Sequence, residues 1–325
     1  MKIRRSSTIV PANKPDLLEK ARHLDADVIV IDVQDAIIKL EQAKLAARDS
    51  AVAAIKKGGF KAREISVRVN SPGSPWFIDD VKAVVQAGVD SIKLTHTYGL
   101  ADVLFAERVI MGYANGREVD IQLSLDMPSA LIELEDIAKQ ATLITCLTLS
   151  LGDFGLEMRS ASHGPRPPIS DEWLSFARSK IVTIARAKGW NASDMIRPMP
   201  MEPEALRAAL HRSRMFGFDG CSVLYPRLIP YVNEMFGVDA EELAWAKDLV
   251  AKWSALAEGS NSTSDYFTID GKTIMRPGYE YAMRLIFYDS VLRGDPEGMA
   301  AYRQNGLASG DYLVERRAAP IKSKN

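Results

Sequence analysis

The fold is decided by the stretch VIVIDVQDAIIKLEQAKLAARDSAVAAIKKGGFKAREISVRVN, residues 28–70. Two short apolar runs, VIVIDV at 28–33 and ISVRVN at 65–70, enclose an Ala- and Lys-rich segment from Glu41 to Lys57. The runs have the length and β-branched content of buried strands, and the segment between them has helical spacing. A strand, a helix and a second strand in this order predict a parallel α/β protein.

The same alternation continues on both sides of this stretch. A first strand, SSTIVPA, precedes it, and further strands with helical stretches behind them follow it as SIKLTH, IQLSLD, LITCLTLSLGD, MIRPMP and GCSVLYP. About eight such pairs within residues 1–237 predict a (β/α)₈ TIM barrel. A doubly wound open sheet is the alternative from the pattern alone. No G-x-G-x-x-G follows the first strand, which weakens the dinucleotide-binding form of that alternative.

Residues 238–325 are predicted to form a C-terminal helical extension. AEELAWAKDLVAKWSALAEG and YEYAMRLIFYDSVL both have helical spacing. The polar, Gly- and Ser-rich stretch between them predicts a flexible loop around residues 259–273.

The composition is that of an ordinary globular protein, with 47% hydrophobic residues, 26% charged residues and a formal net charge of -1. A charge near zero argues against nucleic acid or an anionic membrane as the main partner. No apolar run is long enough to span a bilayer, and the opening MKIRRSSTIVP lacks the apolar core of a secretory signal, so a cytoplasmic location is expected. Cys146 and Cys221 lie in apolar, strand-like runs and are expected to be buried thiols.

Polar residues at the carboxyl ends of the strands are the candidates for chemistry, because barrel enzymes place their sites there. These residues are Asp32, Asp35, Arg68, Asn70, His96, Asp126, Asp153, Arg197 and Tyr225. Asp126 and Asp153 end successive strands and would converge, and two carboxylates with few other ligands suit Mg²⁺. The alternative is that each aspartate caps a helix or is solvated.

Several residues near the expected site carry or can carry a positive charge. Arg68 alternates with valines and would point into the barrel mouth, where it could bind a carboxylate or pair with Asp32 or Asp35. His96 could act as a general base or metal ligand, or have a structural role. Arg4, Arg5 and Lys14 flank the first strand and predict either a phosphate-binding edge or a solvated cluster.

Five motifs then appear in a fixed order along the chain. They are RRSSTIVPANKPDLLEKA, ADVIVIDVQDAI, VRVN followed by Pro75-Trp76, LSLDMPSAL and GFDGCSVLYPRLIPYVNEMF. Together they resemble the citrate lyase β-subunit / HpcH–HpaI aldolase superfamily, particularly its malyl-CoA and citramalyl-CoA lyase-like branch. The resemblance runs from Arg5 to about Ile286.

The resemblance implies a Mg²⁺-dependent carbon–carbon lyase or aldolase, working by retro-aldol or retro-Claisen cleavage or its reverse. Its substrate would be a hydroxyacyl-CoA, in which case CoA enters as part of the substrate, or a small oxo or hydroxy acid. Such families often form trimers or hexamers, which predicts a homotrimer or homohexamer whose C-terminal extension packs on a neighbouring subunit.

The resemblance also assigns roles to residues. Asp126 and Asp153 would hold Mg²⁺, and Arg68 would hold the carbonyl or carboxylate of an oxoacid. Asp35 would also contact the substrate. Arg5 and Lys14 would contact a CoA arm.

Several positions depart from the family pattern. Asp126 stands in place of the family's strand-five Glu, and Tyr225 in place of its strand-eight His. The family's L-E-D is replaced by Val33-Gln34-Asp35, and its Pro-Lys by Thr95-His96. The family's acid/base Asp falls on Met275. Methionine cannot move a proton, so His96, Asp270 and Tyr225 are the candidates for that role. Two alternatives follow, namely a pyruvate-type class II aldolase using a free 2-oxoacid, and a non-catalytic barrel that binds an acyl-CoA or an organic acid.

Overall fold

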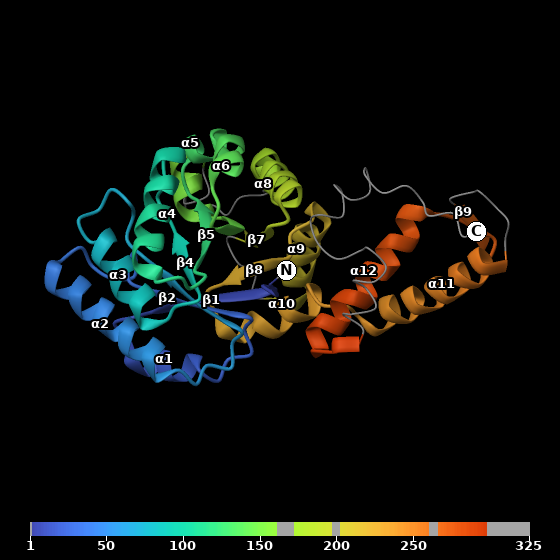
Figure 1. The fold of residues 1–325 in the computed structure, drawn as a ribbon, viewed down its shortest axis with the longest axis horizontal. Coiled ribbons are helices and arrows are strands. Elements are labelled where there is room, and N and C mark those ends of the chain that lie inside the picture. The colour runs from blue at the N-terminus through green and yellow to red at the C-terminus, as the bar shows by residue number, and fades with distance from the viewer. Residues whose placement is uncertain (1, 161–171, 197–201, 260–265, 298–325) are drawn as a thin grey trace. The chain divides into compact units, whose positions relative to one another are not determined.

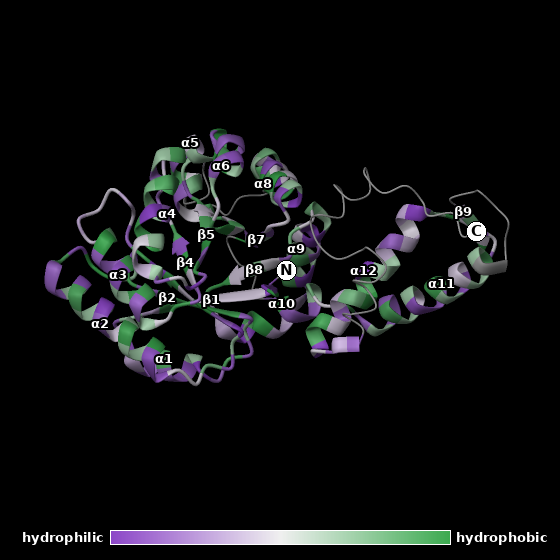
Figure 2. Cartoon of the chain, viewed as in Figure 1, coloured by the Kyte–Doolittle hydropathy of each residue, from purple (hydrophilic) through white to green (hydrophobic). Residues whose placement is uncertain are grey.

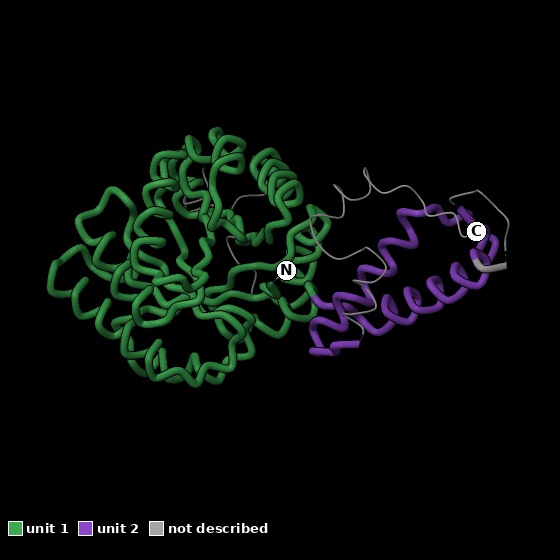
Figure 3. The backbone as a smooth tube through the Cα atoms, in the orientation of Figure 1, with its two compact units in different colours: residues 1–236 green, residues 237–325 purple. Residues whose placement is uncertain are grey.

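The computed structural model, drawn in Figure 1, describes residues 2–160, 172–196, 202–259 and 266–297. The chain divides into two compact units, Met1–Phe236 and Gly237–Asn325, which Figure 3 shows in different colours. The first unit is a barrel, and the second contains two long helices and a hairpin.

Within the described residues, eight parallel strands close into a barrel. Each strand pairs with the next along the chain, and β8 pairs with β1 to complete the circle. The strands are β1 (Ser6–Pro11), β2 (Val28–Asp32), β3 (Glu64–Arg68), β4 (Ser91–Leu94), β5 (Asp120–Leu125), β6 (Ile144–Leu149), β7 (Asn191–Met195) and β8 (Gly220–Val223). The predicted (β/α)₈ barrel is therefore confirmed.

Helices connect the strands and surround the barrel (Figure 1). They are α1 (Pro15–Ala21), α2 (Glu41–Lys57), α3 (Phe77–Ala87), α4 (Leu100–Ala114), α5 (Pro128–Ile132), α6 (Leu134–Gln140), α7 (Leu151–Glu157), η2 (Glu172–Leu174), α8 (Ser175–Lys188), α9 (Pro203–Phe216), η3 (Pro226–Leu228) and α10 (Ile229–Met235). Figure 2 shows hydrophobic and hydrophilic residues interleaved along them, as expected of helices that cover a core on one face. Among the described helices, we find none with the length and apolar character needed to cross a membrane.

The register of the strands decides which side chains face the barrel axis. Paired residues on neighbouring strands point the same way, and successive residues alternate. The side chains that face the barrel axis are polar at the N-terminal rim. There the buried Arg4 guanidinium donates to Glu64 at 2.7 and 3.1 Å, and the Ser91 hydroxyl donates to Glu64 at 2.6 Å. The alternate residues, such as Ile31 and Ile92, are fully buried. The main hydrophobic core therefore lies between the strands and the helices.

The second unit contains α11 (Ala240–Gly259), β9 (Tyr266–Ile269), β10 (Lys272–Met275) and α12 (Arg276–Arg293). Its own small core is centred on Trp253, which meets Phe267 edge-on and stacks on Tyr279, each at 4.9 Å between ring centroids. The packing of this unit on a neighbouring subunit remains a prediction.

The prediction of a flexible loop around residues 259–273 is wrong for residues 266–273, which the structure describes. Residues 266–275 form the antiparallel hairpin β9–β10, whose turn is Asp270-Gly271 with φ values of 49° and 72°. Asp-Gly with both residues in the left-handed region is typical of a two-residue hairpin turn. The polar composition around the turn concealed this signal, and residues 260–265 lie outside the described residues.

Two strands lie earlier in the chain than predicted. Strand β6 ends at Leu149, so Asp153 belongs to the first turn of α7 and not to a strand end. Strand β7 is NASDM and not MIRPMP, and Arg197 lies outside the described residues. NASDM lacks apolar alternation because Asn191 faces the polar interior, while Asp194 forms a buried ion pair with Arg178 at 3.1 Å.

The closure of the barrel between β8 and β1 requires a glycine at position 220. A Cβ there would collide with the backbone carbonyl oxygens of Arg4 and Arg5. We expect Gly220→Ala to lower the free energy of unfolding by at least about 1–3 kcal/mol, the usual cost of overpacking. Gly112→Ala, in α4 where a Cβ meets nothing within 4 Å, should raise it by about 0.5–1 kcal/mol. Urea unfolding of both variants would measure this, and a Gly220→Ala variant as stable as the wild type would contradict it.

Candidate active site

Polar residues gather at one rim of the barrel. Asp32 is the last residue of β2 and Arg68 the last of β3, while Asp126 directly follows β5 and His96 lies two residues after β4. Because the strands are parallel, their carboxyl ends share one rim, and this rim carries the active site in barrel enzymes.

The Arg68 guanidinium is held by two carboxylates. Nε and Nη2 donate to the two oxygens of Asp32 at 2.9 and 2.6 Å, and Nη1 donates to Asp35 at 3.2 Å. Burial opposes the charge of Arg68, but the hydrogen bonds and the charges of these aspartates raise its pKa. A guanidinium has five N–H groups, so two remain without a partner among the described residues. Both expected roles of Arg68, the ion pair and the donor to substrate, are compatible with this geometry.

The Asp126 carboxylate is buried, with 1% of its surface exposed. One oxygen accepts the backbone N–H of His96 at 2.7 Å, and the other accepts the Ser124 hydroxyl at 2.8 Å. Burial raises the pKa of Asp126, while these donors act in the opposite direction. The carboxylate thus fixes the backbone at His96.

His96 has a left-handed backbone, with φ at 50°, and a ring between two polar side chains. Nε2 lies 3.4 Å from the Asp153 carboxylate, and Nδ1 lies 3.4 Å from the Gln34 amide nitrogen. Thr95 donates its hydroxyl to the Gln34 oxygen at 2.8 Å, which leaves the amide N–H to face the ring. The hydrogen bond to Asp153 raises the pKa of His96, against the effect of burial.

Asp35, His96 and Asp153 form a group in which the potential ligand atoms all lie within 4.8 Å of one another. Two carboxylates and an imidazole are donors that divalent cations take in proteins. The Asp153 side chain is 41% exposed, which leaves room for water or substrate ligands. This donor set fits a divalent cation, and Asp126, predicted as a ligand with Asp153, contacts the group through the His96 backbone.

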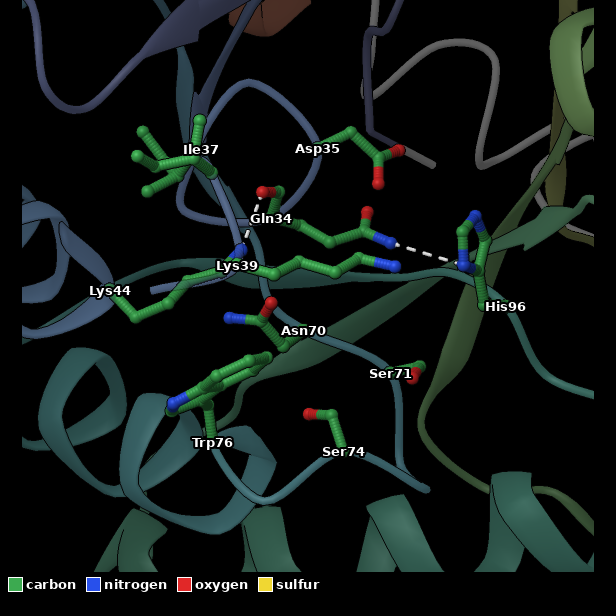
Figure 4. A pocket seen from close by; sticks show the side chains of 11 residues that line it. Gln34, Asp35, Ile37, Lys39, Lys44, Asn70, Ser71, Ser74, Trp76 and His96 are labelled. Carbon is green, nitrogen blue, oxygen red and sulfur yellow. Dashed lines mark hydrogen bonds between the residues drawn. The ribbon is translucent and has the colours of Figure 1, made fainter. Parts of the chain in front are cut away.

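A pocket of about 270 Å³ adjoins this group and shares Asp35 and His96 with it. Figure 4 shows its lining side chains, which come from the segment after β2, from His96 and from the segment after β3. Lys39, Ser71 and Ser74 supply polar groups of the wall.

The family model described as HpcH/HpaI aldolase/citrate lyase matches residues 5–226. The chain belongs to this family. The superfamily predicted from the motifs is thereby confirmed.

Relatives within the HpcH/HpaI family share most of their length with this chain. The citrate lyase subunit beta of Leuconostoc mesenteroides subsp. cremoris is 27% identical over 290 residues, covering 88% of this chain and 93% of that protein. The mitochondrial citramalyl-CoA lyase of Rattus norvegicus is 25% identical, covering 87% and 85%. Protein CitE of Mycobacterium tuberculosis, solved with magnesium, acetoacetate and coenzyme A, has a TM-score of 0.69 at 20% identity, covering 88% and 97%. This structural likeness shows the shared fold.

Arg5 is not at the site of this HpcH/HpaI barrel. It precedes β1 and donates to Asp27, directly before β2, at 2.8 and 2.9 Å. The N-terminal ends of parallel strands form the opposite rim, so the prediction that Arg5 contacts substrate is wrong. Both residues flank β1, but Arg5 precedes the strand and Lys14 follows it, so only Lys14 lies toward the carboxyl-end rim. Lys14 is exposed on the side of the site, and its role remains a prediction.

The other candidates for proton transfer are spread over both units. Tyr225 follows β8 at the rim of the site and is 49% exposed. Asp270 lies in the hairpin turn of the second unit, 2.6 Å from Lys252, and Met275 ends β10 in the same unit. Their roles remain predictions.

Three residues near the site were missed from the sequence. Lys93 faces inward beside Arg68 in the strand register, and burial lowers its pKa to about 8. The alternation Ile92-Lys93-Leu94 contains the signal for this position. Ser124 shares a strand face with the residue two positions later, which predicts its contact with Asp126. The approach of Gln34 to His96 depends on loop geometry and has no local signal.

The ion pair of His96 with Asp153 can be tested by titration. Asp153→Asn removes the carboxylate that holds the proton on His96, so the His96 pKa should fall toward its ordinary value of about 6.5. Because the folded-state pKa is raised, the stabilisation from the pair is present below the ordinary pKa and is lost as the pH rises through the raised one. NMR of the imidazole C–H signals in EDTA, with only four histidines in the chain, would measure it. Asp136→Asn, in an exposed pair with Lys139, is the control, and an unchanged His96 pKa in Asp153→Asn would refute the pairing.

Proposed function

We propose that the chain is a Mg²⁺-dependent carbon–carbon lyase acting on a hydroxyacyl-CoA or a small oxo or hydroxy acid. The observation that carries this proposal is the Arg68 guanidinium, with two unengaged N–H groups, beside the Asp35–His96–Asp153 group at the catalytic rim. Relatives named citrate lyase subunit beta and citramalyl-CoA lyase, and a neighbour solved with magnesium, support the same chemistry.

Asp126 and Asp153 would hold the cation, with Asp35 and His96 beside them. A bound Mg²⁺ would supply Lewis-acid chemistry at a substrate carbonyl. Arg68 would orient the carboxylate or oxo group of the substrate through its two remaining N–H groups, because a planar guanidinium matches a carboxylate in two-point contact. Asp32 keeps that guanidinium in place, so it is ordered before substrate arrives.

The bond cleavage needs a base for the substrate hydroxyl. As the hydroxyl proton leaves, its oxygen becomes a carbonyl, the carbon–carbon bond breaks, and the electron pair passes to the released fragment as an enolate, which is then protonated. His96 would take the proton, because its ring is accessible at the rim and its contact with Asp153 stabilises the protonated form. Asp270 and Tyr225 are the other candidates, since Met275 cannot act.

Arg68→Lys tests the role of the guanidinium. It keeps a positive charge but loses the planar fork, so kcat/KM should fall by about 100-fold or more, as for the loss of a transition-state donor. Cleavage of a panel of hydroxyacyl-CoA thioesters and free hydroxy acids, with Mg²⁺ or with EDTA, would measure it. Arg117→Lys is the control, because Arg117 donates to the carbonyl oxygens of Val85 and Val89 away from the rim. Wild-type activity in Arg68→Lys would refute the role of Arg68, and activity that persists in EDTA would refute the metal dependence.

The metal ligands can be tested without any substrate. Asp153→Ala and Asp126→Ala should each weaken Mg²⁺ binding by about tenfold or more, the usual range for groups that hold or orient a metal. Calorimetric titration of Mg²⁺ into the apoprotein would measure the affinity, with Asp136→Ala as the control for removal of a surface charge. If both variants bind Mg²⁺ as the wild type does, the proposed metal site is wrong.

A further inference from the structure

The pocket beside the Asp35–His96–Asp153 group has a wall that carries unpaired positive charge. Lys39 lines it, and no ion pair or hydrogen bond joins its ammonium group to another described residue. Figure 4 shows the Lys39 side chain extended within the pocket. Among the described lining residues the carboxylate is that of Asp35, which Arg68 contacts at 3.2 Å, against the two ammonium groups of Lys39 and Lys44. The pocket therefore attracts an anion.

Lys44 strengthens this preference without being available as a direct ligand. Its buried ammonium donates to the backbone oxygens of Val33 and Gln34 at 3.2 and 2.6 Å and lies 5.4 Å from the centre of the Trp76 ring. These contacts fix a second positive charge in the wall, while the ammonium of Lys39 remains free to meet a ligand.

Ser74 adds an unsatisfied donor to the same wall. Its hydroxyl oxygen is buried and has no hydrogen-bond partner among the described residues, although its backbone N–H is used in a turn with Ser71. Buried hydroxyls in proteins are almost always hydrogen-bonded, and rotation about the Cα–Cβ bond of Ser74 would let its hydroxyl donate to a group bound in the pocket. The hydroxyl and the Lys39 ammonium together are the donors that a carboxylate takes.

The size of the pocket restricts the occupant. At about 270 Å³ it falls just below the range of about 300–1,000 Å³ that is usual for small-molecule sites. A compact acid fits this volume, whereas a whole CoA molecule does not. The pocket shares Asp35 and His96 with the proposed reaction site, so one short molecule can reach both.

We propose that this pocket binds the distal carboxylate of a short, free oxo- or hydroxy-diacid, with Lys39 as counter-ion and Ser74 as hydrogen-bond donor. The proposal rests on the proposed function for the other end of the molecule, where the oxoacid group meets Arg68 and the metal ligands. It assigns the enzyme to free dicarboxylic substrates, in preference to CoA thioesters.

The test compares two acids of equal chain length, 2-oxoglutarate and 2-oxopentanoate, which differ only in a distal carboxylate or methyl group. Calorimetry with the full chain and Mg²⁺ should give a dissociation constant for 2-oxoglutarate lower by on the order of tenfold, the effect of one charge-assisted contact. Lys39→Gln should remove this difference by weakening 2-oxoglutarate alone, Lys39→Arg should restore most of it, and Ser74→Ala should weaken 2-oxoglutarate by a smaller factor.

Lys20→Gln is the matched control, because it removes one exposed lysine charge from α1 and should leave both affinities unchanged. Equal binding of the two acids by the wild type, or a preference that survives Lys39→Gln, would overturn the pocket assignment alone, since binding of the oxoacid end would persist. Failure of both acids to bind with Mg²⁺ would overturn the proposed function as well. Titration with free CoA is the remaining arm, and weaker CoA binding in Lys39→Gln with unchanged diacid binding would show that the pocket holds a CoA phosphate instead.

Discussion

The site depends on the ion pair between Arg68 and Asp32. Asp32 is fully buried, and besides the two contacts from Arg68 it accepts the backbone N–H groups of Gln34 at 2.8 Å and Ala36 at 3.0 Å. One carboxylate therefore joins the ends of β2 and β3 and shapes the loop that follows β2. That loop brings Asp35 to Arg68 and Gln34 to His96. Removing one partner of such a buried pair would cost about 3–5 kcal/mol, because the other charge would be left uncompensated.

Two departures from the family pattern meet in space. The resemblance places Gln34 at a family glutamate and His96 at a family lysine, and their side chains lie 3.4 Å apart. At these two positions the chain thus has an amide and an imidazole in place of a carboxylate and an ammonium group, and the charge of the imidazole depends on its protonation. The change also supplies an imidazole at the rim, facing Asp153, in a family member whose usual acid/base position is Met275.

The sequence predicted the barrel well because most of its strands, such as β4 and β5, keep an apolar outer face. NASDM failed because its inward Asn191 and Ser193 are polar and its outward Asp194 is paired with Arg178, which gives no hydrophobic signal. Arg68 and His96 were predicted at the site because strand ends can be located from local patterns. The side chains that bind them, such as Gln34, come from loops whose paths depend on contacts distant in the sequence. The prediction that Arg5 contacts substrate was based on its proximity to β1. Arg5 precedes the strand, and a residue that precedes a parallel strand lies at the rim opposite the site.

The two aspartates of the predicted metal pair have opposite environments, and this difference gives them unequal roles. Asp126 is buried, with its pKa raised by burial, and both oxygens already accept hydrogen bonds, one of which holds His96 in its left-handed conformation. Asp153 is partly exposed, and its pKa is lowered by its contact with His96, so it is ionised and open to a ligand. Neighbouring carboxylates whose environments separate their pKa values usually divide their tasks. Asp126 therefore holds the His96 backbone in place, while Asp153 and Asp35 are the more exposed carboxylates of the rim.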